Sequence, residues 1–178
     1  MKKLLVCICV VLGIVPASAY DPAKGALRSL DRLVSGNPSQ RVVRVLGWNG
    51  QDQPEKWNIL VRDPRAPGTF HEFTIENRRM LARRIYQNDQ AGTLPTVTIG
   101  MGGIVLDSSD AFVVADREGK RAKVGFDTIH YELRAKVGGG EPVWYLELRD
   151  QDYRVVGRLE VRATDGKVLR KQWYRPPR

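Results

Sequence analysis

Few residues in this sequence could do acid-base or metal chemistry. The chain has two histidines, His71 and His130, and a lone strand histidine is more typical of a structural side chain than of a metal ligand or catalytic base. No serine lies in a Gly-x-Ser-x-Gly elbow, and the glycines of residues 100–103 lack the Gly-Lys-Ser/Thr of a phosphate loop. Asp150 and Asp152 lack the glycine and glutamate of a calcium loop, so a hairpin turn is expected there. The sequence predicts no catalytic residue, no metal site and no cofactor.

Charged and aromatic side chains alternate with apolar ones along several segments, which is typical of strands with one buried face. In the first half of the chain the exposed face has an apolar and aromatic patch edged by arginine, the composition of a protein-binding surface, with Leu46, Trp48 and Leu60 beside Arg44 and Arg62. A solvated face on which glutamate and arginine pair across strands is the alternative. The residues of the predicted protein-binding face are Arg44, Trp48, Leu60, Arg62, His130, Arg134, Tyr145, Glu147, Arg149 and Arg158.

A second group of side chains is basic. With Tyr86, Trp173 and Tyr174 nearby, it could hold an anionic glycan or polymer by charge and stacking. The residues of this predicted anion-binding set are Arg79, Arg83, Arg84, Lys167 and Lys171.

Two pairs of similar segments indicate an internal repeat. Residues 57–63 resemble residues 144–150, since both run from Trp to Arg-Asp. Residues 80–86 resemble residues 168–174, since both end in a large apolar residue and Tyr. Because the later copy reads as a turn and a strand, a strand is expected over residues 79–86 despite a helical composition.

The spacing of apolar residues predicts a helix over residues 22–34, with Asp21 as its N-cap and Pro22 at its first position. A second helix is expected over residues 110–122, capped by Ser108 or Ser109, with Phe112, Val113 and Ala115 facing inward.

The fold class expected is α+β, with two tandem repeats of a helix packed on a four-stranded antiparallel sheet. The units span residues 20–90 and 107–178. Residues 91–106 form an apolar connecting segment, which is expected to pack between the units or to add an edge strand.

The first nineteen residues have the pattern of a secretory signal, with Lys2 and Lys3, an apolar run and a small-residue site at Ala17 and Ala19. Cleavage after Ala19 would remove both cysteines, and Val6 before Cys7 disfavours a lipid anchor. The chain carries a formal net charge of +9, and cleavage would remove two of its positive charges. We expect a periplasmic or secreted protein without disulfides, peripheral to a membrane at most.

Residues 142–150 followed by residues 157–168 resemble the secreted PepSY-type domain, in which an aromatic strand, a polar turn, a second strand and a glycine turn follow one another. Arg162 stands where that family has an acidic residue. The resemblance implies a small extracytoplasmic, non-catalytic module that binds or inhibits other proteins. Tandem helix-plus-sheet units are also similar in architecture to the secreted β-lactamase inhibitor protein.

The first functional hypothesis is therefore an exported, non-enzymatic module that presents a sheet face to another extracytoplasmic protein. The second is a binder of anionic envelope polysaccharide through the basic strands. The third is a hydrolase with an unfamiliar site that uses His71 or His130. The export signal argues against a nucleic-acid partner.

Overall fold

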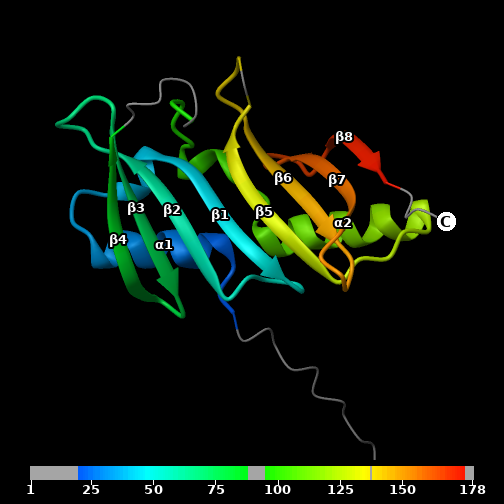
Figure 1. Ribbon diagram of the computed structural model, residues 1–178. Coiled ribbons are helices and arrows are strands. Elements are labelled where there is room, and N and C mark those ends of the chain that lie inside the picture. The colour runs from blue at the N-terminus through cyan, green and yellow to red at the C-terminus, as the bar shows by residue number, and fades with distance from the viewer. Residues whose placement is uncertain (1–19, 88–94, 137, 175–178) are drawn as a thin grey trace, which may run out of the picture.

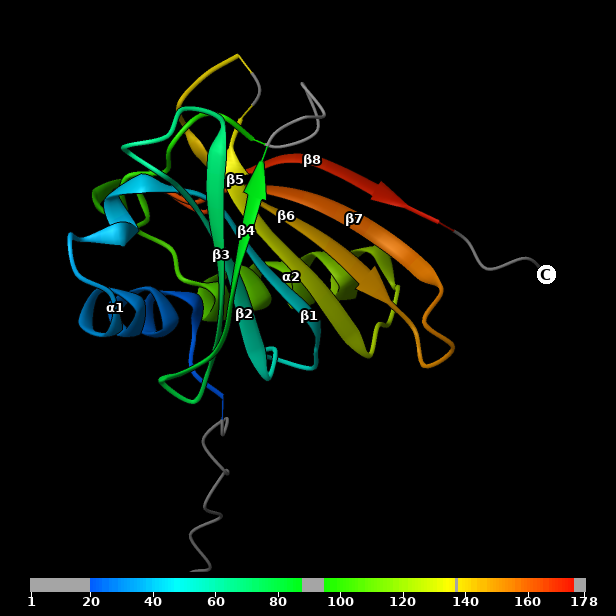
Figure 2. The same ribbon diagram turned by 60° about the vertical axis from the view of Figure 1, so that its left-hand side comes forward.

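The fold is one antiparallel sheet with both helices on the same face. A computed structural model describes residues 20–87, 95–136 and 138–174. Both helices lie behind the sheet in Figure 1, and the turned view of Figure 2 shows them on the same side of the twisted strands. The elements are α1 (Ala23–Leu33), η1 (Pro38–Arg41), β1 (Val42–Gly50), β2 (Lys56–Arg62), β3 (Thr69–Glu76), β4 (Arg79–Gln87), η2 (Met101–Gly103), α2 (Ser108–Ala122), β5 (Thr128–Ala135), β6 (Pro142–Arg149), β7 (Val155–Arg162) and β8 (Val168–Trp173).

The sheet has eight strands in the order β4-β3-β2-β1-β5-β6-β7-β8. The prediction of two helix-plus-four-stranded-sheet repeats was wrong, because β1 and β5 pair antiparallel with each other, for example at Val45 and Leu133. An edge strand has a row of unpaired backbone amides and carbonyls. Here β1 and β5 pair these groups with each other. The molecule is therefore one continuous sheet with two helices.

The individual strands lie close to where the alternation places them. The strand expected over residues 79–86 is confirmed as β4, which pairs with β3 along its length. Asp150 begins the turn between β6 and β7, and its carboxylate accepts the amides of Asp152 and Arg154. The hairpin turn expected there is confirmed.

The helix caps differ from those expected. Pro22 is the N-cap of α1 and supplies no side-chain cap. Asp107, and neither serine, is the N-cap of α2, in a capping box with Asp110. Val113 is 61% exposed, contrary to the prediction that it faces inward.

Three aromatic rings fill the centre of the core between sheet and helices. Trp57, Tyr131 and Trp144 lie with ring centroids 5.9–6.3 Å apart. The indole of Trp57 donates to the carbonyl of Asp21 at the start of α1, at 2.8 Å. Gly47 lets the Trp57 ring approach β1, since a Cβ there would come within 2.7 Å of it.

The described part of the connecting segment, residues 95–106, packs onto the core without forming a strand. Ile99 and Ile104 are buried, and the Ile99 amide donates to the carbonyl of Val42. Of the two arrangements expected for this segment, the edge strand is absent from residues 95–106. Residues 91–94 lie outside the described part of the chain.

Candidate functional site

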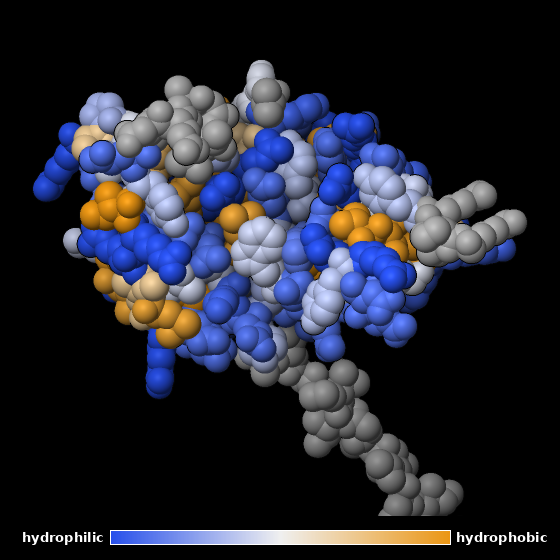
Figure 3. Space-filling view, in the orientation of Figure 1, coloured by the Kyte–Doolittle hydropathy of each residue, from blue (hydrophilic) through white to orange (hydrophobic). Residues whose placement is uncertain are grey.

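The face of the sheet turned away from the helices, called the open face below, is hollowed across β1 and β5 to β8. Figure 3 shows it as mostly hydrophilic, with separate apolar areas between the charged side chains. A groove of about 420 Å³ lies there. Its lining residues are Leu46, Trp48, His130, Tyr131, Glu132, Tyr145, Leu146, Glu147, Arg158, Leu159, Glu160, Arg170 and Gln172.

A β-bulge at the end of β1 positions one wall of this groove. The pairing of β1 with β5 shifts between Gly47 and Gly50, so that both Trp48 and Asn49 come opposite His130. Asn49, in the bulge, has a φ of 52°. This is a left-handed backbone conformation, which asparagine adopts more readily than most residues. The Trp48 ring consequently meets the His130 ring edge-on at 4.6 Å.

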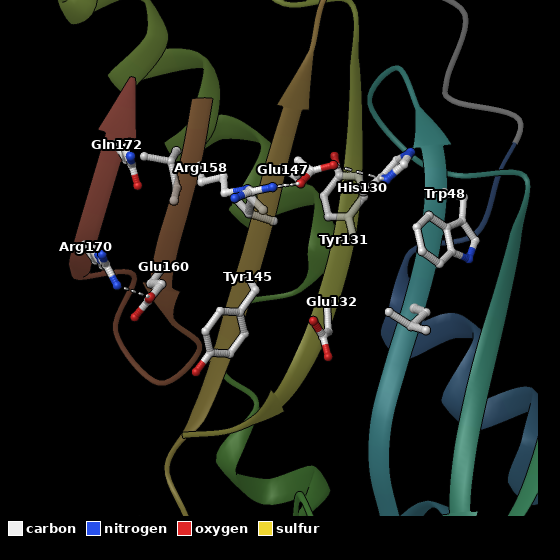
Figure 4. Close-up of a pocket in the computed structure, with 13 residues that line it drawn as sticks. Trp48, His130, Tyr131, Glu132, Tyr145, Glu147, Arg158, Glu160, Arg170 and Gln172 are labelled. Carbon is white, nitrogen blue, oxygen red and sulfur yellow. Dashed lines mark hydrogen bonds and ion pairs between the residues drawn. The ribbon is translucent and has the colours of Figure 1, made fainter. Parts of the chain in front are cut away.

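Glu147 on β6 is the centre of the charged groups in the groove. Figure 4 shows Arg158 and His130 approaching it from either side. Arg158 donates to its Oε2 from Nε at 3.0 Å and Nη2 at 2.7 Å, and Arg149 donates to its Oε1. Partial burial favours the protonated acid, but the bonds from Arg158 and Arg149 outweigh it and hold the pKa of Glu147 below its ordinary value.

The surroundings of His130 favour its neutral form. Burial and then the charge of Arg149 lower its pKa, against an opposing effect of Glu147. Its Nε2 lies 2.6 Å from Oδ1 of Asn49, and because a side-chain amide oxygen can only accept, Nε2 carries the proton. Its Nδ1 is 3.8 Å from Glu147, which is too far for a hydrogen bond.

The other end of the open face combines an aromatic ring with arginines. The guanidinium of Arg134 lies 3.8 Å from the centroid of the Tyr145 ring, and Arg134 also pairs with Glu132 at 3.1 Å. Arg44 is directly opposite Arg134 in the strand register. Its Nε is buried and has no hydrogen-bond partner among the described residues. Arg44, Arg134 and Glu132 therefore lie together at this end.

The structure places most of the predicted protein-binding face together. Five of its members line the groove: Trp48, His130, Tyr145, Glu147 and Arg158. The same face also carries, by register and outside the groove, Arg44, Arg62, Arg134 and Arg149. The prediction for Leu60 was wrong, because it is buried with Val43 and Phe70 in a small cluster of its own.

The predicted anion-binding set does not form one surface. Arg79, Arg83 and Arg84 are on β4 and Lys171 is on β8, which are opposite edges of the sheet. Lys167 lies just before β8. The Lys171 ammonium donates to buried Glu118 of α2 at 3.0 Å, so that it ties a helix to the sheet.

His71 is separate from the groove. Its Nε2 is 2.8 Å from the Asp63 carboxylate, and its Nδ1 is 3.2 Å from Arg83. No group of three or more His, Cys, Asp or Glu residues among the described ranges is arranged to hold a metal ion.

Sequence reasoning missed the groove residues Gln172 and Arg170 and the support given by Asn49. Gln172 and Arg170 alternate along β8 and pair with open-face residues of β7, so the period of two could have identified them. The role of Asn49 depends on the bulge between β1 and β5, for which the sequence carries no clear signal beyond Asn-Gly.

The comparisons with known proteins concern the fold alone. No protein-family model matches the chain and no curated protein is significantly similar to it. The solved structure of a putative lipoprotein from Clostridium difficile is similar, with a TM-score of 0.52, 14% identity, and coverage of 74% of this chain and 81% of that one. Among the described residues no helix has the length and apolar character needed to cross a bilayer.

Proposed function

We propose that this protein is an exported, non-enzymatic module that binds another extracytoplasmic protein through the groove on its open face. The observation that carries this is the exposure of Trp48, whose side chain is 49% accessible at the wall of the groove. Tryptophan, tyrosine and arginine are enriched at the energetic centres of protein interfaces. Trp48, Tyr145 and Arg158 bring these types together across three strands.

The charges of the groove support a protein partner. Glu147 is neutralised by Arg149 and Arg158, and Glu160 lies 4.0 Å from Arg170. Pairs that are already formed lower the cost of covering the surface, because neither ion is left alone when water is excluded. A partner with apolar side chains for Trp48 and Leu46 and a polar rim suits this arrangement.

The export part of the proposal is supported by the signal pattern of residues 1–19, which lie outside the described part of the chain. The neighbour's description as a putative lipoprotein is compatible with that location.

The test is capture from an envelope extract with residues 20–178 as bait, at low and at high salt, followed by affinity measurement with the captured protein. Trp48→Ala is expected to lower the affinity by about 2 kcal/mol, which is roughly thirtyfold in Kd. Leu33→Ala is the matched control, since Leu33 has the same 49% exposure on α1. Equal affinities of the two variants, or retention of anionic polymer alone and only at low salt, would contradict the proposal.

A further inference from the structure

The outer edge of β4 has no strand partner among the described residues. β4 pairs with β3 on one side only and ends the sheet order. From Arg83 to Gln87 every residue is exposed. Natural sheets protect such edges because unpaired backbone amides and carbonyls accept a further strand.

Large apolar side chains are unusually exposed on this strand. Leu81 is 54%, Ile85 64% and Tyr86 36% exposed. By register, Tyr86 lies opposite Phe70 and Ile85 opposite His71, so the two side chains point to opposite faces of the sheet. An added strand would therefore meet an apolar side chain on each face.

The charged side chains of β4 are all positive. Arg84 is directly opposite Glu72 in the register but forms no ion pair within the described residues, and Arg83 lies over the Phe73 ring at 5.5 Å. A second copy of β4 pairing with this edge would bring arginine near arginine, and like charges across strands are destabilising. The edge favours a negatively charged strand over its own copy.

The opposite edge of the sheet lacks these properties. Lys171 of β8 is bound by Glu118 and Arg170 lies near Glu160. Trp173 is packed on Gly157, where a Cβ would come within 2.5 Å of the ring. The cations of β8 lie beside carboxylates and the Trp173 ring is packed against Gly157. We therefore expect β8 to bind an acidic or apolar partner strand less well than β4.

We propose that the free edge of β4 binds an extended acidic segment of another protein as an additional antiparallel strand. Two consecutive carboxylates would lie opposite Arg84 and Arg83, preceded by two apolar residues opposite Tyr86 and Ile85. In such strand addition the backbone hydrogen bonds give affinity and the alternating side chains give selectivity. This surface is distinct from the groove, which draws on β1 and β5 to β8.

The experiment measures binding of the peptide acetyl-Thr-Thr-Val-Val-Glu-Glu-Thr-Thr-amide to residues 20–178 by NMR titration at low ionic strength. We expect chemical-shift changes and slowed amide exchange in β4, and about tenfold weaker binding of the peptide with Lys-Lys in place of Glu-Glu. Two peptides test for strand addition, each N-methylated on one of the two alternate sets of residues. Only the peptide whose methylated amides face β4 should lose binding, because those amides donate to the edge of the sheet. Equal loss for both, or shifts spread over the groove, would overturn the proposal.

Charge reversal supplies the matched variants. Arg83→Glu with Arg84→Glu should reverse the preference toward the Lys-Lys peptide, whereas Arg170→Glu on β8 and Trp48→Ala in the groove should leave it unchanged. Arg84→Glu alone gives a second readout if the double variant is unstable, since Arg83 contacts His71 and Phe73. A β4-dependent dimer without peptide, or equal binding of an acidic polysaccharide, would show that the edge serves another partner.

Discussion

At the scale of single residues, Glu147 holds the charged side chains of the groove together. It accepts hydrogen bonds from two arginines while its side chain is only 23% exposed. Removing its charge would leave Arg149 and Arg158 close together, with no carboxylate between them. Both residues of the β1 bulge, Trp48 and Asn49, contact His130. The Nδ1 of His130 lies 3.8 Å from the Glu147 carboxylate.

Glu147→Gln is expected to lower the free energy of unfolding at neutral pH by about 1–3 kcal/mol, because hydrogen bonds to a charged group are lost. The pKa of Glu147 is depressed in the fold, so its contribution is present above the ordinary pKa of about 4.3 and is lost as pH falls through the depressed value. Urea denaturation of wild type and variant at a series of pH values measures this difference.

The control for that series is Glu55→Gln, on the exposed turn before β2. Its effect should be small at every pH. A wild-type minus Glu147→Gln difference that stays constant down to strongly acidic pH would show that the carboxylate charge is not the cause.

The alternation of polar and apolar residues was enough to predict that Tyr145, Glu147 and Arg158 share a face. It could not predict that Trp48 and Asn49 both oppose His130, because a bulge adds a residue without changing the local pattern. It also failed for Leu60, which lies on a nominally open face yet is covered by neighbours from other segments.

At the scale of elements, the start of α2 also caps α1. Asp107 accepts the amide of Lys24 and takes part in its own capping box with Asp110. Ser108 accepts the amide of Ala23. One pair of side chains thus caps the first turns of two helices that are far apart in sequence. This explains how α1 begins at Ala23, although its N-cap residue Pro22 supplies no side-chain hydrogen bond.

Asp107→Ala is therefore expected to cost about 2 kcal/mol of stability, roughly twice the cost of losing an ordinary N-cap. Asp110→Ala is the matched variant, since it removes only the reciprocal bond to the Asp107 amide, and it should cost less than about 1 kcal/mol. Thermal or urea denaturation compares them, and equal losses would mean that the contact with α1 contributes nothing.

The helices themselves could be predicted from spacing, but their caps could not. The amides at the start of α1 are capped from another segment, which leaves no local signature, so Asp21 was predicted incorrectly. The cap of α2 is local, but it is Asp107, one residue before the predicted serines. The strand over residues 79–86 was predictable only by comparison with residues 168–174, because its own composition favours a helix.

At the scale of the whole molecule, the pairing of β1 with β5 makes the two halves one folding unit. Val45 and Leu133 face each other across this pair, and both are fully buried. Core residues from both sides of the pair belong to a single hydrophobic cluster. Unfolding one half would expose a long strand edge and part of the shared aromatic core in the other.

Leu133→Ala should destabilise the entire chain by about 2–5 kcal/mol, in one cooperative transition. Amide exchange of β3 and β7, on opposite sides of the β1–β5 pair, should accelerate together. Val113→Ala, at a 61% exposed site, should change stability by less than about 0.5 kcal/mol. Separate transitions for the two halves would show that they fold independently.

The continuous sheet was the part of the architecture that the sequence could not supply. No turn joins β1 to β5, and the segment between them contains β2 to β4 and α2. Patterns that identify a strand say nothing about which distant strand it joins, so two separate four-stranded sheets were as consistent with the alternation as one sheet of eight.

The position of the groove across the β1–β5 pair bears on the entropy of recognition. One wall comes from β1 and the remainder from β5 to β8, and the backbone ladder between them sets their spacing before any partner arrives. The cost of ordering this surface is met during folding rather than during association. Affinity at such a preorganised surface depends on how well a partner's shape matches it, more than on the area covered.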